Sequence, residues 1–505
     1  MSNLLPDQLR LMAENFPDEL AFVNVETNYS MTFNEWDRES NRMARWIVAQ
    51  GLEKGDRVAI HVPPEEPERF LVTYTAIHKA GTAAVPISTR LVARELGYVL
   101  EHSGATLAFS GASTLPIIIE AAKSAPALRQ IVTTGETSSP IAVNWGMATD
   151  PDDSPIQIPV ENTDLADVMY TSGTTGRPKG VVVRHGNVAM MPNGVPNWSG
   201  KGWFHASPMF TFAGIASNYN PMKLGLTLMY LPKFDVNKWF DTVEQRKPSA
   251  VFLVPAMAEL LIASPRFDSA DLSSIVMCSL GSAPLAPATF ATLRNRFPQA
   301  IVSNSWGMTE AGPAYCHMPT EEHAKRVGSV GRPVPPTEVR IIDEDGNVLP
   351  PRTIGQLTVR NPGREREYFR DPEATANSWK DGWLHTGDMA EVDEDGYLYL
   401  RGRMKDMIIR GGNNVYSSDV ESVIYEHPAV REAAVAGIAH KVLGEDIGAW
   451  IVLKDGMSAT AEELTAFCAE RLSDYKVPRA WTFVNDLPRN ATGKVVKSDL
   501  PGRIS

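Results

Sequence analysis

The sequence is short of cysteine, of long apolar runs and of basic charge. Cys278, Cys316 and Cys468 are the only cysteines among 505 residues, and no C-x-x-C pair occurs. This excludes a disulfide scaffold and the common cysteine metal motif. No stretch approaches ~18 consecutive apolar residues, so we expect no transmembrane helix and no integral membrane association. With 48 lysines and arginines against 60 aspartates and glutamates, the net charge is −12, which disfavours a nucleic-acid partner.

The remaining composition is that of an ordinary globular protein. Hydrophobic residues make up 43% and charged residues 21% of the chain, which is enough for a large core. At roughly 150 residues per domain, the length suggests two to four domains. The first residues show no basic stretch followed by an apolar run, and the last five match no lipidation signal. We therefore expect a cytoplasmic protein.

The first half of the chain alternates strand and helix patterns. Strands are predicted at Arg57–Val62, Ala83–Ile87 and Ala105–Phe109, and helices at Pro67–Ala80 and Arg90–His102. This βαβα order predicts parallel sheets covered by helices.

A second α/β pattern occurs later in the chain. Ala250–Val254, Ile275–Leu280 and Ala300–Ser303 read as strands, and the last two end in polar or glycine-containing loops at 281–284 and 304–310. Ligands of open α/β sheets bind outside the carboxyl ends of the strands. These two loops are therefore candidate walls of one site.

The pattern of predicted strands and helices changes near residues 330 and 402. Short strands separated by turns between 330 and 400 indicate a small antiparallel unit or β-barrel, and a compact α+β unit follows. We predict an α/β protein whose large N-terminal domain, residues 1–402, holds two α/β subdomains and a small β-barrel. A small α+β domain, residues 403–505, completes the chain.

The most informative segment is Tyr170–Gly180, which reads YTSGTTGRPKG. Glycines let backbone N–H groups approach an anion, hydroxyls donate to phosphate oxygens, and lysine and arginine neutralise them. A flexible hydrophilic turn is the alternative, but the length of the loop and its two cations favour a phosphate loop. It is not a Walker A loop, because Lys179 lies between Pro178 and Gly180. No G-x-G-x-x-G motif opens a helix, so dinucleotide binding has no support.

Tyr170–Gly180 resembles the signature loop of the adenylate-forming superfamily, which includes acyl- and aryl-CoA synthetases, peptide-synthetase adenylation domains and beetle luciferases. Similar stretches follow in the order typical of this family: Gly281–Pro284, Trp306–Glu310, His385–Asp388, Gly402–Asp406, Gly411–Asn413 and Pro488–Lys494. The resemblance covers nearly the whole chain. It implies that the enzyme uses ATP, Mg²⁺ and CoA, converts a carboxylic acid to acyl-AMP and pyrophosphate, and then forms a thioester. Catalysis would consist mainly of positioning and charge stabilisation.

The resemblance also implies a role for each matching residue. The β- and γ-phosphates would be held by Thr171, Ser172, Gly173, Thr174, Thr175 and Lys179. Thr309 would contact the α-phosphate, and Glu310 would bind Mg²⁺ as a hard oxygen ligand. The adenine would be lined by Gly281, Ser282 and Ala283, bonded by Asn304 and stacked on Trp306, which Gly307 follows. Asp388 would accept from the ribose hydroxyls, helped by Arg403.

The small C-terminal domain is implied to be mobile. Lys494 would bridge the substrate carboxylate and the α-phosphate, although a lysine in a glycine-containing loop is more often a solvated surface residue. Lys405 occupies the family's hinge position. After adenylation the domain would swing, and Gly411 and Gly412 would help to form the tunnel for the pantetheine arm of CoA.

Several positions depart from the family pattern and bear on the substrate. Thr211 stands where many relatives have histidine and where amino-acid-activating domains have aspartate, which disfavours an α-amino acid. Phe210, Thr211 and Gly214 are candidate walls of the acid pocket, although the same stretch fits a buried helix equally well. The charged stretch Arg364–Glu367 replaces a less charged one. No cation for a second substrate carboxylate stands out. We expect a medium- or long-chain fatty acid, or an aryl or alicyclic acid, including steroid-derived ones.

Three other interpretations remain open at this stage. The enzyme could load the thiol of a carrier protein, the chain could be a nucleotide-binding protein without catalysis, or it could be a phosphotransferase, which would release ADP. A homodimer is one assembly that the sequence leaves open.

Overall fold

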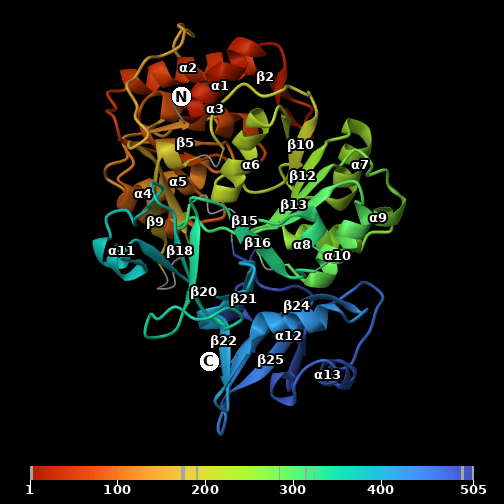
Figure 1. Ribbon diagram of the computed structural model, residues 1–505. Coiled ribbons are helices and arrows are strands. Elements are labelled where there is room, and N and C mark those ends of the chain that lie inside the picture. Colours follow the sequence, from red (N-terminus) through yellow and green to blue (C-terminus); the bar gives the residue numbers. More distant parts are fainter. Residues whose placement is uncertain are drawn as a thin grey trace. The chain divides into compact units, whose positions relative to one another are not determined.

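The computed structural model describes residues 4–171, 177–188, 191–283, 285–312, 316–323, 325–490 and 494–502. The chain forms two compact units, each of α-helices and β-sheets (Figure 1), which confirms the predicted α/β class. Unit 1 comprises Met1–Phe252, Met308–Pro313 and Gly363–Asn377, and unit 2 comprises Leu253–Gly307, Ala314–Pro362 and Ser378–Ser505. None of the described helices is long and apolar enough to cross a membrane.

The first sheet of unit 1 has the strand order β7-β6-β5-β3-β4-β8-β9. Its strands are β3 (Arg57–His61), β4 (Ala83–Pro86), β5 (Leu107–Ser110), β6 (Gln130–Thr133), β7 (Ala142–Asn144), β8 (Leu165–Thr171) and β9 (Lys179–Arg184). Only β8 and β9 run antiparallel to each other. Helices α3 (Pro67–Lys79), α4 (Ala93–Ser103) and α5 (Leu115–Ala122) connect the parallel strands. The predicted βα alternation is therefore confirmed.

The second sheet of unit 1 contains the strand order β12-β10-β11-β1-β2. Its strands are β1 (Leu20–Asn24), β2 (Ser30–Thr32), β10 (Gly202–His205), β11 (Thr227–Tyr230) and β12 (Ala250–Leu253). The helices of this region are α1 (Leu5–Asn15), α2 (Phe33–Ala49), α6 (Phe212–Lys223) and α7 (Val236–Arg246). A capping box begins α2, because Thr32 and Glu35 each bond the other's backbone N–H. Trp36, Tyr74 and Tyr219, from three helices, pack in one buried cluster that anchors α6.

Unit 2 begins with α8 (Pro255–Ile262), α9 (Arg266–Ser269) and α10 (Pro287–Arg296), and with the parallel strands β13 (Met277–Gly281) and β14 (Ile301–Ser305). An antiparallel sheet follows in the order β15-β16-β21-β20-β18-β17, and β19 pairs with β20. These strands are β15 (Cys316–His317), β16 (Ser329–Pro333), β17 (Glu338–Ile342), β18 (Gly355–Arg360), β19 (Trp379–Lys380), β20 (Trp383–Val392) and β21 (Leu398–Arg403). Helix α11 (Pro372–Ser378) precedes β19 in the chain.

The last part of unit 2 is an α+β arrangement, as predicted. Its strands β22 (Met407–Arg410), β23 (Asn413–Tyr416), β24 (Val430–His440), β25 (Gly444–Leu453) and β26 (Ala480–Phe483) form one sheet. Helices α12 (Ser417–Tyr425) and α13 (Ala461–Ala469) supply Ile424, Leu464 and Cys468 to the core that this sheet covers. All described residues of this core come after Met407, so the segment has its own hydrophobic interior.

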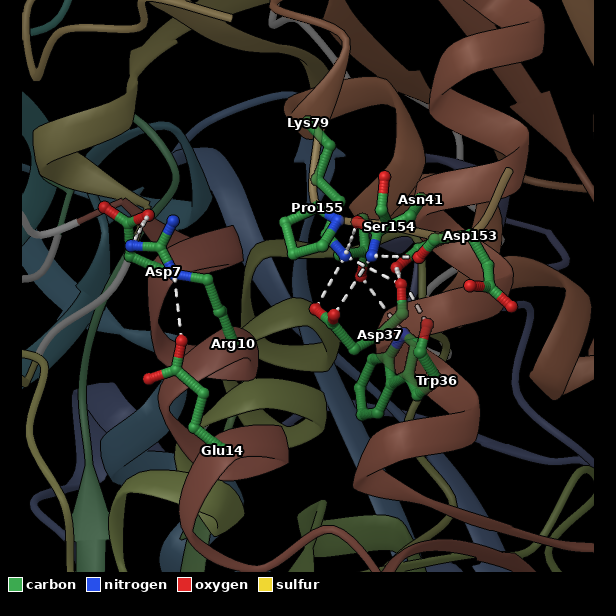
Figure 2. Close-up of polar contacts among 12 residues, drawn as sticks. Asp7, Arg10, Glu14, Trp36, Asp37, Asn41, Lys79, Asp153, Ser154 and Pro155 are labelled. Atoms are coloured by element: carbon green, nitrogen blue, oxygen red, sulfur yellow. Dashed lines mark hydrogen bonds and ion pairs between the residues drawn. The ribbon is translucent and has the colours of Figure 1, made fainter. Parts of the chain in front are cut away.

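A buried ion pair ties α2 to α3 in unit 1 (Figure 2). The Lys79 ammonium donates to Asp37 Oδ1 at 2.7 Å, to the Asp37 carbonyl at 2.9 Å and to Asn41 Oδ1 at 2.7 Å. All three of its protons are therefore used. Burial lowers the pKa of Lys79 to about 8, and the nearby Asp37 carboxylate opposes this shift. The pair borders a cavity of about 390 Å³, at whose edge Arg10 pairs with Asp7 at 3.2 Å.

We expect Lys79→Met to lower the free energy of unfolding of unit 1 by about 3–5 kcal/mol, because it leaves the Asp37 carboxylate buried without a counter-charge. The double variant Lys79→Met/Asp37→Leu should recover most of this loss. Urea unfolding followed by tryptophan fluorescence measures both. Lys123→Met removes an exposed pair with Glu120 and should cost no more than about 1 kcal/mol. A loss for Lys79→Met as small as that of this control would refute a structural role for the pair.

Candidate active site

The predicted phosphate loop connects β8 to β9. Thr171, the last residue of β8, pairs with Lys179, the first residue of β9, so the two ends of the loop lie side by side. Ser172, Gly173, Thr174 and Thr175 lie outside the described residues. Gly180 is required at the next position, since a Cβ there would lie 2.7 Å from Val168 Cγ1. The hairpin thus holds Thr171 and Lys179 at the mouth of the loop.

Thr171 meets a second predicted motif. Its hydroxyl donates to Glu310 Oε1 at 2.9 Å, although the two residues lie 139 positions apart in the chain. Both side chains are half-buried. The structure therefore brings Thr171, the first of the predicted phosphate-binding residues, and the predicted metal ligand together within unit 1.

The segment Glu367–Phe369 runs along β9. Val182 donates its backbone N–H to the Glu367 carbonyl at 2.9 Å, and Phe369 donates to the Gly180 carbonyl at 2.7 Å. This places the Lys179 ammonium 4.8 Å from the centre of the Tyr368 ring, which is a cation–π distance. The sequence prediction did not include Tyr368.

Arg366, directly before this segment, is 5% exposed. Its guanidinium donates through Nη1 to the Thr309 carbonyl and through Nη2 to the Asn187 carbonyl, the latter at 2.9 Å. It also lies 4.9 Å from the centre of the Phe212 ring. Burial lowers the pKa of Arg366 to about 10, while the charges of Asp167 and Glu310 oppose this shift. The group therefore stays protonated at neutral pH and holds the loop that carries Thr309.

The donor set around Glu310 suits Mg²⁺. The side chain offers hard carboxylate oxygen beside the Thr171 hydroxyl, and no group of three or more His, Cys, Asp or Glu side chains that could hold a metal occurs in the described part of the chain. Mg²⁺ is commonly held by one or two carboxylates together with substrate phosphates, and not by a cage of protein ligands. A single carboxylate next to a phosphate loop fits this pattern.

A second group of predicted residues meets in unit 2. Asp388 Oδ1 pairs with Arg403 Nε at 2.8 Å, and Asp388 Oδ2 accepts from Trp306 Nε1–H at 3.2 Å. Asp388 and Arg403 face each other on neighbouring strands β20 and β21. Asp388 is 7% exposed, and a carboxylate oxygen can accept more than one hydrogen bond. This arrangement can accept hydrogen bonds from a diol.

The predicted adenine residues follow two adjacent strands of unit 2. Gly281 ends β13 opposite Ser305 of β14, and Leu280 lies opposite Asn304. Ser282 has a φ of +71°, a left-handed conformation that sharply turns the chain out of β13. Ala283 comes directly after it, and Gly307 is exposed beyond Trp306. The carboxyl ends of these parallel strands therefore carry the residues that the sequence assigned to the adenine.

The predicted acid-pocket residues surround the start of α6. Thr211 is the N-cap: its hydroxyl accepts from the Gly214 N–H and donates to the Pro208 carbonyl, both at 2.9 Å. A Cβ at Gly214 would lie 2.0 Å from the Pro208 oxygen, so only glycine fits there. Phe210 is partly buried against the core. The alternative interpretation of this stretch as a helix is correct for residues 212–217.

Two of the predicted C-terminal sites lie on turns, and the third, Lys494, lies outside the helices and strands. Gly411 and Gly412, with φ of +56° and +84°, form the two-residue turn between β22 and β23, as a type I′ hairpin requires. Lys405 is exposed in the short 3₁₀ turn Met404–Asp406. Lys494 is exposed, and its backbone N–H donates to Asn490 Oδ1 at 3.0 Å.

Sequence reasoning missed Arg366 and Tyr368 as site residues. The sequence contained one indication, because the charged stretch Arg364–Glu367 departs from the family pattern. Alternating charges, however, are typical of a solvated loop. Only the structure shows that the second arginine of that stretch is buried beside Thr309 and Phe212.

Comparisons with known proteins identify the family of the chain. Residues 9–369 match the family model described as AMP-binding enzyme, and residues 419–494 match the AMP-binding enzyme C-terminal domain. The chain is 36% identical to a feruloyl-CoA synthase of Amycolatopsis sp, covering 94% of each chain. It is 32% identical to the long-chain-fatty-acid–CoA ligase FadD13 of Mycobacterium tuberculosis, covering 97% of each.

The solved structures point in the same direction. The structure of the anthranilate CoA ligase AuaEII in complex with anthranoyl-AMP superposes with a TM-score of 0.86 at 25% identity, covering 97% of this chain and 95% of that one. Fold and site thus define an adenylate-forming enzyme of the acyl-CoA synthetase type. Since the first family model spans more than half of the sequence, the chain belongs to the AMP-binding enzyme family.

Proposed function

We propose that this enzyme uses ATP to activate an apolar carboxylic acid and then transfers the acyl group to the thiol of CoA. The hydrogen bond between Thr171 and Glu310 carries the proposal, because it joins a phosphate loop to a carboxylate suited to Mg²⁺. The match to the family model supports the same reaction class.

In the first step a carboxylate oxygen of the acid attacks the α-phosphorus of ATP. The bond from that phosphorus to the β-phosphate oxygen breaks, and pyrophosphate leaves. Lys179 and the phosphate loop neutralise the β- and γ-phosphates, and Thr309 contacts the α-phosphate. When bound at Glu310, Mg²⁺ supplies charge neutralisation. Asp388 and Arg403 hold the ribose, while Trp306, Gly307, Asn304 and the turn Gly281–Ala283 line the adenine.

In the second step the CoA sulfur attacks the acyl carbonyl carbon, AMP leaves, and the thiol proton passes to solvent. We propose that residues 403–505 form the domain that changes position between the two steps. Lys494 serves adenylation, and Gly411 and Gly412 line the path of the thiol. Lys405 lies three residues after the proposed boundary, in an exposed 3₁₀ turn, which suits a hinge.

The acid itself is proposed to be a medium- or long-chain fatty acid, or an aryl or alicyclic acid such as a steroid-derived one. Phe210, Phe212 and Gly214 offer an aromatic and small-residue surface that suits an apolar acyl group. The similarity to enzymes named for feruloyl and for long-chain fatty acids supports both aryl and fatty acids as substrate classes.

The test is AMP release measured with CoA against acids of graded chain length and ring content. We expect one class of acid to raise AMP release well above the rate without acid, and acyl-CoA to accumulate one for one with AMP. Acid-dependent pyrophosphate exchange without free acyl-CoA would indicate a carrier-protein thiol as acceptor. Release of ADP would contradict the proposal.

A further inference from the structure

Arg366 carries more donor capacity than the protein uses. A guanidinium has five N–H donors, and the structure gives this one two acceptors, the carbonyls of Thr309 and Asn187. Among the residues that the structure describes, none is a hydrogen-bond partner of its buried Nε. A buried guanidinium with unpaired donors is costly unless an anion or another acceptor completes it.

The surroundings of Arg366 are built to admit the guanidinium and offer it no ion pair. Gly312 has a φ of +69°, and a Cβ there would lie 3.1 Å from Arg366 Nε. Asp167 and Glu310 attract the group, yet within the part of the chain that the structure describes neither forms an ion pair with it. Asp167 is instead bonded to Tyr74 at 3.1 Å and to His78 at 3.1 Å. Glu310 accepts from Thr171.

The nearest predicted acid-pocket residues offer no donor for the carboxylate of the acid. Thr211 commits its only proton to the Pro208 carbonyl, and Phe212 has no polar side-chain atom. The guanidinium lies 4.9 Å from the centre of the Phe212 ring and is bonded to the carbonyl of Thr309. It therefore stands between the proposed acyl wall and the loop assigned to the α-phosphate. In the proposed reaction the carboxylate of the acid must lie in this place.

We propose that Arg366 binds the carboxylate of the acid substrate. The carbonyls of Thr309 and Asn187 fix the plane of the guanidinium, so that its remaining N–H groups donate to the carboxylate oxygens and lower the repulsion between this anion and the α-phosphate. This inference rests on the proposed function and adds to it a residue that binds the reacting carboxylate.

The test compares Arg366→Met, Arg366→Gln and Arg366→Lys in acid-dependent pyrophosphate exchange. Loss of a buried, charge-assisted donor should raise KM for the acid by about 30-fold or more, while KM for ATP changes little. Arg366→Lys keeps the charge but lacks the planar set of N–H donors, so its KM for the acid should lie between those of the wild type and Arg366→Met. Arg370→Met, which alters an exposed arginine in the same segment, should leave both KM values unchanged.

The outcomes separate the alternatives. An unchanged KM for the acid in the folded variants, or a rise in KM for ATP alone, would overturn the inference. Thermal unfolding identifies any variant that fails to fold. If Arg366→Met and Arg366→Gln fail to fold, KM for the acid in Arg366→Lys, which keeps the buried charge, tests the inference. If the wild-type enzyme shows no acid-dependent exchange, the proposed function fails. If the wild type is active and the variants keep their acid KM, only the role of Arg366 fails.

Discussion

Lys494→Ala is expected to abolish acyl-AMP formation and to leave thioester formation from supplied acyl-AMP and CoA nearly intact. A lysine that bridges two anions stabilises charge that develops only during adenylation, and loss of one such donor typically costs about 10²–10³ in rate. The substitution keeps the two hydrogen bonds between residues 490 and 494, because both use the backbone of Lys494. Pyrophosphate exchange measures the first half-reaction, and thioester formation from synthetic acyl-AMP measures the second.

Lys380→Ala provides the matched control, since Lys380 is exposed in unit 2 and has no assigned role. Both half-reactions should match those of the wild type in this variant. If Lys494→Ala slows the two half-reactions equally, Lys494 does not act in adenylation alone, and the assignment of a domain rearrangement between the steps is wrong.

Glu310→Gln is expected to lower the rate of adenylation by about 10²–10³. Glutamine keeps the size of the side chain and an oxygen that can accept from Thr171, but it removes the charge that suits Mg²⁺. Part of the lost rate should return as the Mg²⁺ concentration is raised. Pyrophosphate exchange titrated with Mg²⁺ provides the measurement.

Glu367→Gln is the control for the loss of a carboxylate. Glu367 forms an exposed pair with Arg184 at 2.8 Å, which contributes little to stability, and its replacement should leave exchange and its Mg²⁺ dependence unchanged. An exchange rate for Glu310→Gln within a few-fold of wild type would show that Glu310 is not the metal ligand.

The alternation of strands and helices was readable from the sequence because hydrophobic period and turn residues report it directly. The strands at Arg57–His61 and Ala250–Leu253 and the helix at Pro67–Lys79 lie within a residue or two of their predicted bounds. The start of α6 was ambiguous. Its apolar residues have no clear polar face, since both sides of the helix are partly buried, so periodicity could not separate a pocket wall from a helix.

The contacts of the site were less accessible to sequence reasoning. Family resemblance assigned Thr171 and Glu310 to neighbouring phosphates and metal, but their direct bond depends on how β8 and the loop after β14 fold. Thr211 is a second residue whose contacts the sequence did not predict. Its position predicts a substrate contact, whereas its hydroxyl bonds are made within its own turn. The burial of Arg366 was not predicted, because burial of a loop residue depends on contacts distant in sequence.

The most direct test of the central claim uses an acid labelled with ¹⁸O in its carboxylate. If the acid attacks the α-phosphorus, thioester formation must leave one ¹⁸O atom in AMP, with one pyrophosphate released for each AMP. Mass spectrometry of AMP from turnover with ATP, Mg²⁺, CoA and the preferred acid gives the answer. Unlabelled AMP, or ADP and phosphate as products, would contradict the account.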